Sequence, residues 1–281
     1  MKKRFKKIYV EITNRCNLKC SFCGSSKLPF KSMSIDEFEY VVKKIKPFTD
    51  YIYLHVKGEP LLYTELDKAL LICDRENIKV NITTNGTLLK EKYDILNKHA
   101  SIRQINISLH SENDYPNYFK NVFFACKLLS TKMFISYRIW TLNNYKLDKK
   151  STDIVNKIIE YYKLDQEIVE KLKNENSIKI DDNTFVNKEN LFIWPDDYTG
   201  YTIDSFCYGL DSHIGILSNG TVVPCCLDST GEINLGNIFN EELSDILDKE
   251  FVRNIIDGFK NNKSYCNLCK KCNFRNRFLK K

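Results

Sequence analysis

Three cysteines, Cys16, Cys20 and Cys23, lie within eight residues in the stretch RCNLKCSFC near the start of the sequence. A structural zinc site uses four ligands, so three thiols leave one position unfilled. A disulfide framework uses paired cysteines in a secreted chain, but the short apolar stretch after the basic first residues is interrupted by Glu11. We therefore expect reduced thiols in a cytoplasmic protein. Three cysteines can hold an iron-sulfur cluster whose remaining iron stays open to a substrate or cofactor.

The C-x3-C-x2-C spacing, with the aromatic Phe22 directly before the last cysteine, resembles the signature of the radical S-adenosylmethionine (radical SAM) superfamily. The resemblance implies that the three cysteines are catalytic and bind a 4Fe-4S cluster, with Phe22 at the cofactor. In that family the open iron binds S-adenosylmethionine, and one electron breaks a carbon-sulfur bond to give a 5'-deoxyadenosyl radical. This radical removes a hydrogen atom from a substrate. The resemblance also implies a reductant such as flavodoxin or ferredoxin.

The sequence alternates between β-branched or aromatic runs and apolar residues at helical spacing. Such alternation is typical of right-handed crossovers and a parallel sheet. Strands are expected at residues 7–13, 51–56, 79–85, 104–109 and 134–140. Helices are expected from a capping box at Ser34 and Glu37 to Pro47, after a cap at Thr64, and at residues 88–99, 117–131 and 151–175.

Polar and glycine-containing segments follow the predicted strands at the same end. The cysteine loop follows the first strand, KGEP (57–60) the second, TNGT (84–87) the third and SLHS (108–111) the fourth, and Arg138 lies late in the fifth. Catalytic groups of barrel folds come from the carboxyl ends of strands. We therefore predict an α/β fold, a partial (β/α)6 TIM-like barrel, over residues 1–190.

The KGEP segment resembles the Gly-Gly-Glu-type motif of the same family, whose backbone oxygens bind the ammonium group of the cofactor. Lys57 stands where the family has its first glycine, so the resemblance implies a cofactor-binding role only for Gly58 and Glu59.

Three further strand-end residues, Asn85, Ser108 and Arg138, match positions that contact the ribose or carboxylate of the cofactor in similar proteins. Each also has a structural interpretation. Asn85 and Gly86 form a common turn pair, Ser108 is able to bind a strand-end amide, and Arg138 is able to form a buried ion pair. Both interpretations stay open.

A second group of cysteines lies in the C-terminal region. From about residue 190 the sequence pattern predicts short strands and turns, with a hairpin at Asn219 and Gly220. This region resembles the SPASM or twitch-type extension of radical SAM proteins, with one auxiliary 4Fe-4S cluster over residues 191–281. The predicted metal ligands are Cys207, Cys225, Cys269 and Cys272. A zinc site formed by the same thiols stays an alternative, because tetrathiolate sites suit both metals. Cys226 and Cys266 are then spare as ligands or hydrogen donors.

No apolar run approaches the about 20 residues that span a bilayer, so we expect no membrane partner. The net charge of +7, with lysines at both ends, indicates either a solvated basic face or a contact with RNA. We therefore expect a radical SAM enzyme, of oxidoreductase or peptide-modifying type, whose substrate is a peptide, a small molecule or RNA. The alternative is an iron-sulfur protein that only transfers electrons, although such a protein has no use for an ammonium-binding KGEP segment.

Overall fold

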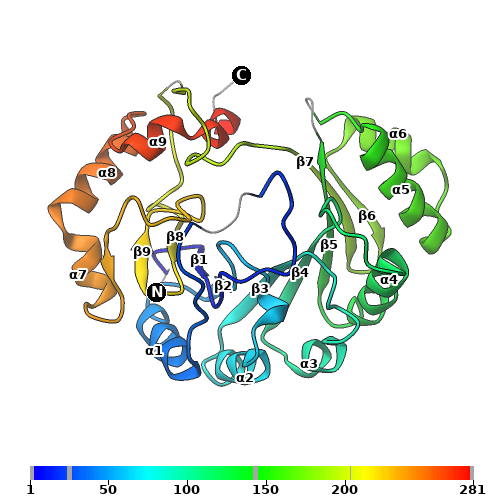
Figure 1. Ribbon diagram of the computed structural model, residues 1–281, viewed down its shortest axis with the longest axis horizontal. Helices are drawn as coiled ribbons and strands as arrows, with labels where there is room; N and C mark the ends of the chain where they lie inside the picture. Colours follow the sequence, from blue (N-terminus) through cyan, green and yellow to red (C-terminus); the bar gives the residue numbers. More distant parts are fainter. Residues whose placement is uncertain (1–2, 24–26, 142–144, 203, 279–281) are drawn as a thin grey trace. The chain divides into compact units, whose positions relative to one another are not determined.

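The computed structural model describes residues 3–23, 27–141, 145–202 and 204–278 (Figure 1). The chain forms two compact units. The first unit comprises residues 1–80 and 192–281, so that both ends of the chain belong to it. The second unit comprises residues 81–191. Each unit contains its own strands and covering helices.

The first unit contains a sheet in which strands from both ends of the chain lie side by side (Figure 1). Its order is β10-β9-β8-β1-β2. β8 is parallel to β1, with Ile8 opposite Ile214, and the hairpin strand β9 is antiparallel to β8. The C-terminal hairpin therefore extends the N-terminal sheet beside β1. The strands are β1 (Lys7–Val10), β2 (Tyr51–Tyr53), β8 (His213–Ile216), β9 (Thr221–Val223) and β10 (Gly236–Asn237).

The helices of the first unit begin with the one that the capping box predicted. The Ser34 side chain accepts from the Glu37 N–H, and the Glu37 carboxylate accepts from the Ser34 N–H, so this prediction is confirmed. The predicted cap at Thr64 is wrong, because the helix begins one residue later, after Glu65, and has no side-chain cap. The elements are α1 (Ile35–Ile45), η1 (Pro60–Leu62), α2 (Leu66–Arg75), α7 (Leu243–Asp248), α8 (Glu250–Lys260), α9 (Asn267–Lys271) and η2 (Asn273–Phe278).

The second unit has the strand order β3-β4-β5-β7-β6, with β3 starting at the border between the units. β4, β5 and β7 are parallel, and β6 is an antiparallel edge strand. The strands are β3 (Lys79–Thr84), β4 (Ile102–Ser108), β5 (Phe134–Thr141), β6 (Ser177–Asp181) and β7 (Thr184–Asn190). The helices are α3 (Tyr93–Lys98), α4 (Tyr118–Leu129), α5 (Lys149–Tyr162) and α6 (Glu167–Asn174).

Two expectations for the second unit are corrected. The single helix expected at 151–175 is two helices, because Lys163 adopts the left-handed conformation (φ 53°) and ends α5. The helix expected at 88–99 begins only at Tyr93. The strand that follows β5 in the parallel sheet is β7, which the sequence analysis did not anticipate.

The alternation of strands and helices bears out the predicted α/β fold class. The predicted division into a barrel domain (residues 1–190) and a cluster-binding domain (residues 191–281) stays a prediction. The contacts within the structure group residues 192–281 with residues 1–80. In the described part of the chain, no helix combines the length and the apolar character needed to cross a membrane.

Candidate iron-sulfur sites

The first cysteine site lies in a loop that leaves the sheet after β1. The base of the loop is closed by the hydroxyls of Thr13 and Ser32, 2.8 Å apart. The Asn14 side chain donates to the Pro29 carbonyl at 2.9 Å and accepts from the Lys31 N–H at 2.9 Å. These contacts fix the base of the loop on either side of the three cysteines.

The three thiols of this loop are accessible. Cys16 is exposed, and Cys20 and Cys23 are partly buried. The Cys23 N–H donates to the Cys20 carbonyl at 3.1 Å, which folds the second half of the motif into a tight turn. Phe22, the predicted neighbour of the cofactor, is partly buried in the same turn. Accessible thiols on a loop anchored at its base suit a metal centre that also receives a second ligand.

The KGEP segment packs against the base of this loop. Gly58 has a positive φ of 78°, and a Cβ there would lie 2.2 Å from the Thr13 carbonyl oxygen. The Glu59 N–H donates to the Arg15 carbonyl at 2.8 Å. Only glycine allows this approach at low cost. The structure therefore brings Gly58 and Glu59 to the cysteine loop, and their contact with the cofactor stays a prediction.

Lys57 adds a positive charge at the same place. Its Nζ donates to the Cys23 carbonyl, lies 4.0 Å from the Cys23 Sγ and sits 3.3 Å from the centre of the Trp194 ring. Burial lowers the pKa of Lys57 below its usual value. Its N–H donates to Glu11, whose buried carboxylate also accepts from the Ser218 N–H and hydroxyl. Through these hydrogen bonds Glu11 connects the end of β1 to the hairpin turn after β8. Burial raises the pKa of the Glu11 carboxyl.

The three remaining predicted cofactor residues belong to the second unit. Ser108 ends β4 and lies opposite Arg138 on β5, so the register brings these two together. Arg138 is also 3.9 Å from the Glu189 carboxylate. Asn85 stands in a turn, where its Oδ1 accepts from the N–H and hydroxyl of Thr87. The turn expected as the structural role of Asn85 is present, whereas the Arg138–Glu189 pair is partly exposed and is not the buried ion pair considered for Arg138. Cofactor contact by all three residues stays a prediction.

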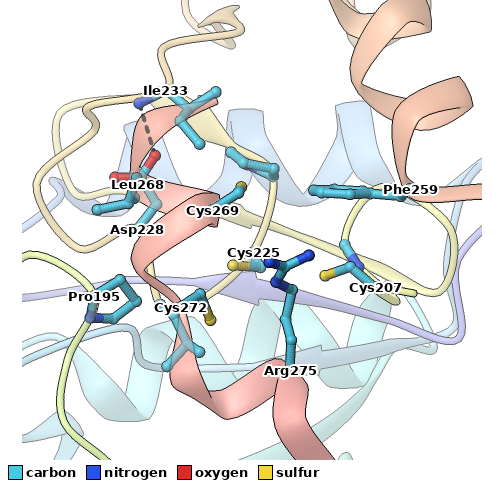
Figure 2. A pocket seen from close by; sticks show the side chains of 13 residues that line it. Pro195, Cys207, Cys225, Asp228, Ile233, Phe259, Leu268, Cys269, Cys272 and Arg275 are labelled. Carbon is cyan, nitrogen blue, oxygen red and sulfur yellow. Dashed lines mark hydrogen bonds between the residues drawn. The ribbon is translucent and has the colours of Figure 1, made fainter. Parts of the chain in front are cut away.

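The second cysteine site is a pocket that is lined by all four predicted ligands (Figure 2). Cys207 precedes β8, Cys225 follows β9, Cys269 lies in α9 and Cys272 ends α9. Cys269 and Cys272 are buried. Burial raises the pKa of all four thiols, and the neighbouring thiols raise those of Cys225, Cys269 and Cys272 further. We name this set the four-cysteine pocket.

Cys226 and Cys266 do not line the four-cysteine pocket. Cys226 packs against a buried cluster that includes Tyr9 and Val56. β9 ends at Val223, because Pro224 cannot donate to the ladder, so Cys225 and Cys226 both lie in the turn after the strand and not in the strand itself. Cys266 precedes α9, and burial raises its pKa to about 11.

Arg275 is a pocket residue that the sequence analysis missed. Its side chain is only 1% exposed and lines the four-cysteine pocket. Its Nε has no hydrogen-bond partner among the described residues. The four cysteines line one pocket together with a buried cation that has an unused donor, although no three of them already gather around a single point in the described part of the chain. This set of groups fits an anionic metal-thiolate cluster. The FRNRF run that contains Arg275 reads in the sequence as part of a solvated basic terminus, so nothing local marked it.

Comparison with known families agrees with this geometry. The radical SAM superfamily matches residues 10–152, half of the chain, and the iron-sulfur cluster-binding SPASM domain matches residues 207–273. The chain therefore belongs to the radical SAM superfamily and carries a SPASM domain. Its cofactors are the cluster that binds S-adenosylmethionine, S-adenosylmethionine itself and an auxiliary iron-sulfur cluster.

Curated relatives match only part of the chain. A probable GTP 3',8-cyclase of Methanococcus maripaludis is 36% identical over 127 residues, 44% of this chain and 42% of the relative. The GTP 3',8-cyclase of Aquifex aeolicus is 36% identical over 121 residues, 40% of this chain and 37% of the relative. The chain thus spans about two fifths of the length of these curated relatives.

Solved structures share the fold over nearly the whole chain. BtrN in complex with AdoMet and 2-DOIA has a TM-score of 0.58 at 19% identity, over 97% of this chain and 94% of BtrN. Streptococcus suis SuiB bound to the precursor peptide SuiA has a TM-score of 0.62 at 20% identity, over 96% and 71%. anSMEcpe with AdoMet and the Cp18Cys peptide has a TM-score of 0.61 at 16% identity, over 95% and 86%. These likenesses describe the fold.

Proposed function

We propose that this chain is a radical SAM enzyme that removes a hydrogen atom from a peptide side chain or a small molecule and completes its oxidation with the help of an auxiliary cluster. The observation that carries the proposal is the packing of Gly58 and Glu59 onto the base of an accessible three-cysteine loop. A protein that only transfers electrons has no use for this arrangement.

The residues of the first site have separate roles in this proposal. Cys16, Cys20 and Cys23 would hold a cluster that three cysteines leave open at one iron. When bound, that cluster supplies one electron to S-adenosylmethionine, which yields methionine and the 5'-deoxyadenosyl radical that takes the hydrogen atom. Gly58 sets the path of the backbone where the cofactor's ammonium group binds. Lys57, which stands where the family motif has its first glycine, places a cation beside Cys23.

The four-cysteine pocket serves the second half of the reaction. Cys207, Cys225, Cys269 and Cys272 would hold a cluster that could accept the one electron that a substrate radical loses as it gives a proton to solvent and becomes the oxidised product. The electron used to cleave S-adenosylmethionine is then balanced by the electron that the substrate loses. Four cysteine ligands suit this role, since they would leave no open iron to react with the substrate.

Proteins of the same fold include one solved with a precursor peptide and one solved with 2-DOIA, so the fold supports both substrate classes. We favour these over RNA, because the lysines at the two ends of the chain are the only sequence feature that suggests a nucleic acid. A reductant such as flavodoxin or ferredoxin completes the proposed system.

The test is formation of 5'-deoxyadenosine by anaerobically reconstituted protein with S-adenosylmethionine and dithionite. We expect slow cleavage without substrate and none in the C16A/C20A/C23A variant. The substrate class is then assigned by adding separately the peptide, small-molecule and RNA fractions of a cell extract. Stimulation that protease abolishes indicates a peptide, and stimulation that ribonuclease abolishes contradicts the favoured classes. No cleavage by the iron-loaded wild type would overturn the proposal.

A further inference from the structure

Arg275 is the largest side chain that the first unit buries completely. It lies in η2, two turns beyond the start of α9, and its guanidinium group points into the four-cysteine pocket (Figure 2). A buried guanidinium stays charged, because its pKa lies far above neutrality. Burying that charge is costly unless an anion or several acceptors surround it.

The hydrogen bonds of Arg275 satisfy only part of this need. Nη1 donates to the Ser205 carbonyl at 3.0 Å, and Nη2 donates to the Thr202 hydroxyl at 3.2 Å. Both acceptors are neutral. In the described part of the chain, no carboxylate forms an ion pair with Arg275, and its Nε has no acceptor. The side chain is therefore held at its outer end by Thr202 and Ser205, with one donor and its charge left for the pocket.

The pocket offers the missing anion when its cysteines are ionised. Cys207, Cys225, Cys269 and Cys272 line the same pocket as the Arg275 guanidinium. Four thiolates around an iron-sulfur core give a net negative assembly, which becomes more negative when the cluster is reduced. A fixed cation beside it stabilises the reduced form more than the oxidised form.

We propose that Arg275 is a positioning residue for the auxiliary cluster, whose guanidinium neutralises part of the charge and whose Nε–H donates to a cluster sulfur. This rests on the proposed four-cysteine cluster. The consequence is a more positive reduction potential, since nearby charge and hydrogen bonds to the sulfurs set that potential. A more positive potential lets the cluster accept the electron that the substrate radical loses. Arg275 thus acts on the reaction through the cluster, at a distance from the substrate.

The test is a redox titration, followed by electron paramagnetic resonance, in a C16A/C20A/C23A parent that retains only the auxiliary cluster. Arg275→Gln is expected to shift the midpoint to more negative potential, with an about tenfold change in the one-electron equilibrium constant, or 59 mV. Arg275→Lys retains the charge and is expected to shift less. Arg277→Gln is the matched control: it lies in the same η2 helix, over the Phe274 ring and outside the pocket, and should not shift the midpoint.

Each outcome decides the proposal. An Arg275→Gln protein with a loaded cluster and the potential of the parent would overturn the role of Arg275 alone. A folded Arg275→Gln protein without iron, beside an Arg275→Lys protein that binds iron, supports it. Equal loss of iron and of melting temperature in both variants would assign Arg275 to packing and overturn the proposal. Zinc instead of iron in the parent would overturn the auxiliary cluster, and this proposal with it.

Discussion

The two cysteine sites belong to the same compact unit and differ in almost every physical respect. The three-cysteine site is a loop fixed only at its base, with Cys16 exposed. The four-cysteine pocket is built from segments near 207, 225 and 270, and two of its cysteines, Cys269 and Cys272, are buried, as is Arg275. A cluster held by three ligands at an accessible site can also bind a cofactor. A cluster held by four ligands has no open iron and can only accept or donate electrons. Exposure and ligand count together therefore separate the two predicted roles.

The largest expected effect is on the accessible site. The C16A/C20A/C23A variant should lose all detectable cleavage of S-adenosylmethionine, and its iron content should fall from about eight to about four per chain. The sheet should stay folded, because the loop lies outside it. Iron analysis, product chromatography and circular dichroism check these outcomes. Cleavage that persists in the reconstituted triple variant would contradict the account.

Removal of one ligand from the closed site should have the converse effect. Cys225→Ala is expected to retain about four irons and slow cleavage of S-adenosylmethionine, while the auxiliary cluster is lost. Its melting temperature should fall by roughly 5 °C or more, because metal binding contributes to folding and Arg275 loses its counter-charge.

Cys226→Ala is the matched control for this change, since the neighbouring thiol packs against Tyr9 and Val56 instead of lining the pocket. It should retain about eight irons. Loss of iron in Cys226→Ala together with retention in Cys225→Ala would show that the ligand assignment is wrong.

A smaller effect is expected from Gly58→Ala. The positive φ and the 2.2 Å approach of a new Cβ to the Thr13 oxygen should cost about 1–3 kcal/mol of unfolding free energy. Because the strain falls at the base of the cysteine loop, iron should be lost from the first site alone. Denaturant unfolding and iron analysis measure both effects.

The control is Gly258→Ala in α8, where the backbone has no positive φ. It should change the stability less and leave the iron content as in the wild type. Equal behaviour of the two variants would remove Gly58 from the account of the site.

The smallest effect concerns the folded protein without clusters. Iodoacetamide should modify Cys16 and Cys20 about tenfold or more faster than Cys269 and Cys272, because access limits the reaction of a buried thiol. Mass spectrometry of digests taken over time gives the rates, with guanidinium-unfolded protein as the reference. Similar rates for all four thiols in the folded protein would abolish the contrast between the sites.

The sequence predicted the fold where the signals were local. The Ser34 and Glu37 pair gave the start of α1, and Asn219 with Gly220 gave the β8–β9 hairpin. It missed the end of α5, because Lys163 takes a left-handed conformation that is unusual for lysine. It also missed the pairing of β8 with β1, because about 200 residues separate these strands and no local pattern records such a contact.

The sites show the same division. The resemblance to the SPASM or twitch-type extension named four cysteines that the structure places in one pocket, and the KGEP segment placed Gly58 at the loop. Their roles as ligands stay a prediction. Arg275 escaped prediction because burial of a charge depends on tertiary packing, and basic residues near a chain end usually face solvent. Which group pairs with a buried charge is decided by the tertiary packing of the pocket, and no residue spacing in the sequence predicts it.

The central claim is that one cluster is open to S-adenosylmethionine and the other is closed. Electron paramagnetic resonance of the reduced protein, with and without S-adenosylmethionine, tests it most directly in the wild type, the C16A/C20A/C23A variant and Cys225→Ala. The account predicts that the cofactor changes the signal of the wild type and of Cys225→Ala and leaves that of the triple variant unchanged. A signal of the triple variant that responds to S-adenosylmethionine would contradict the account, because the open iron would then lie in the four-cysteine pocket.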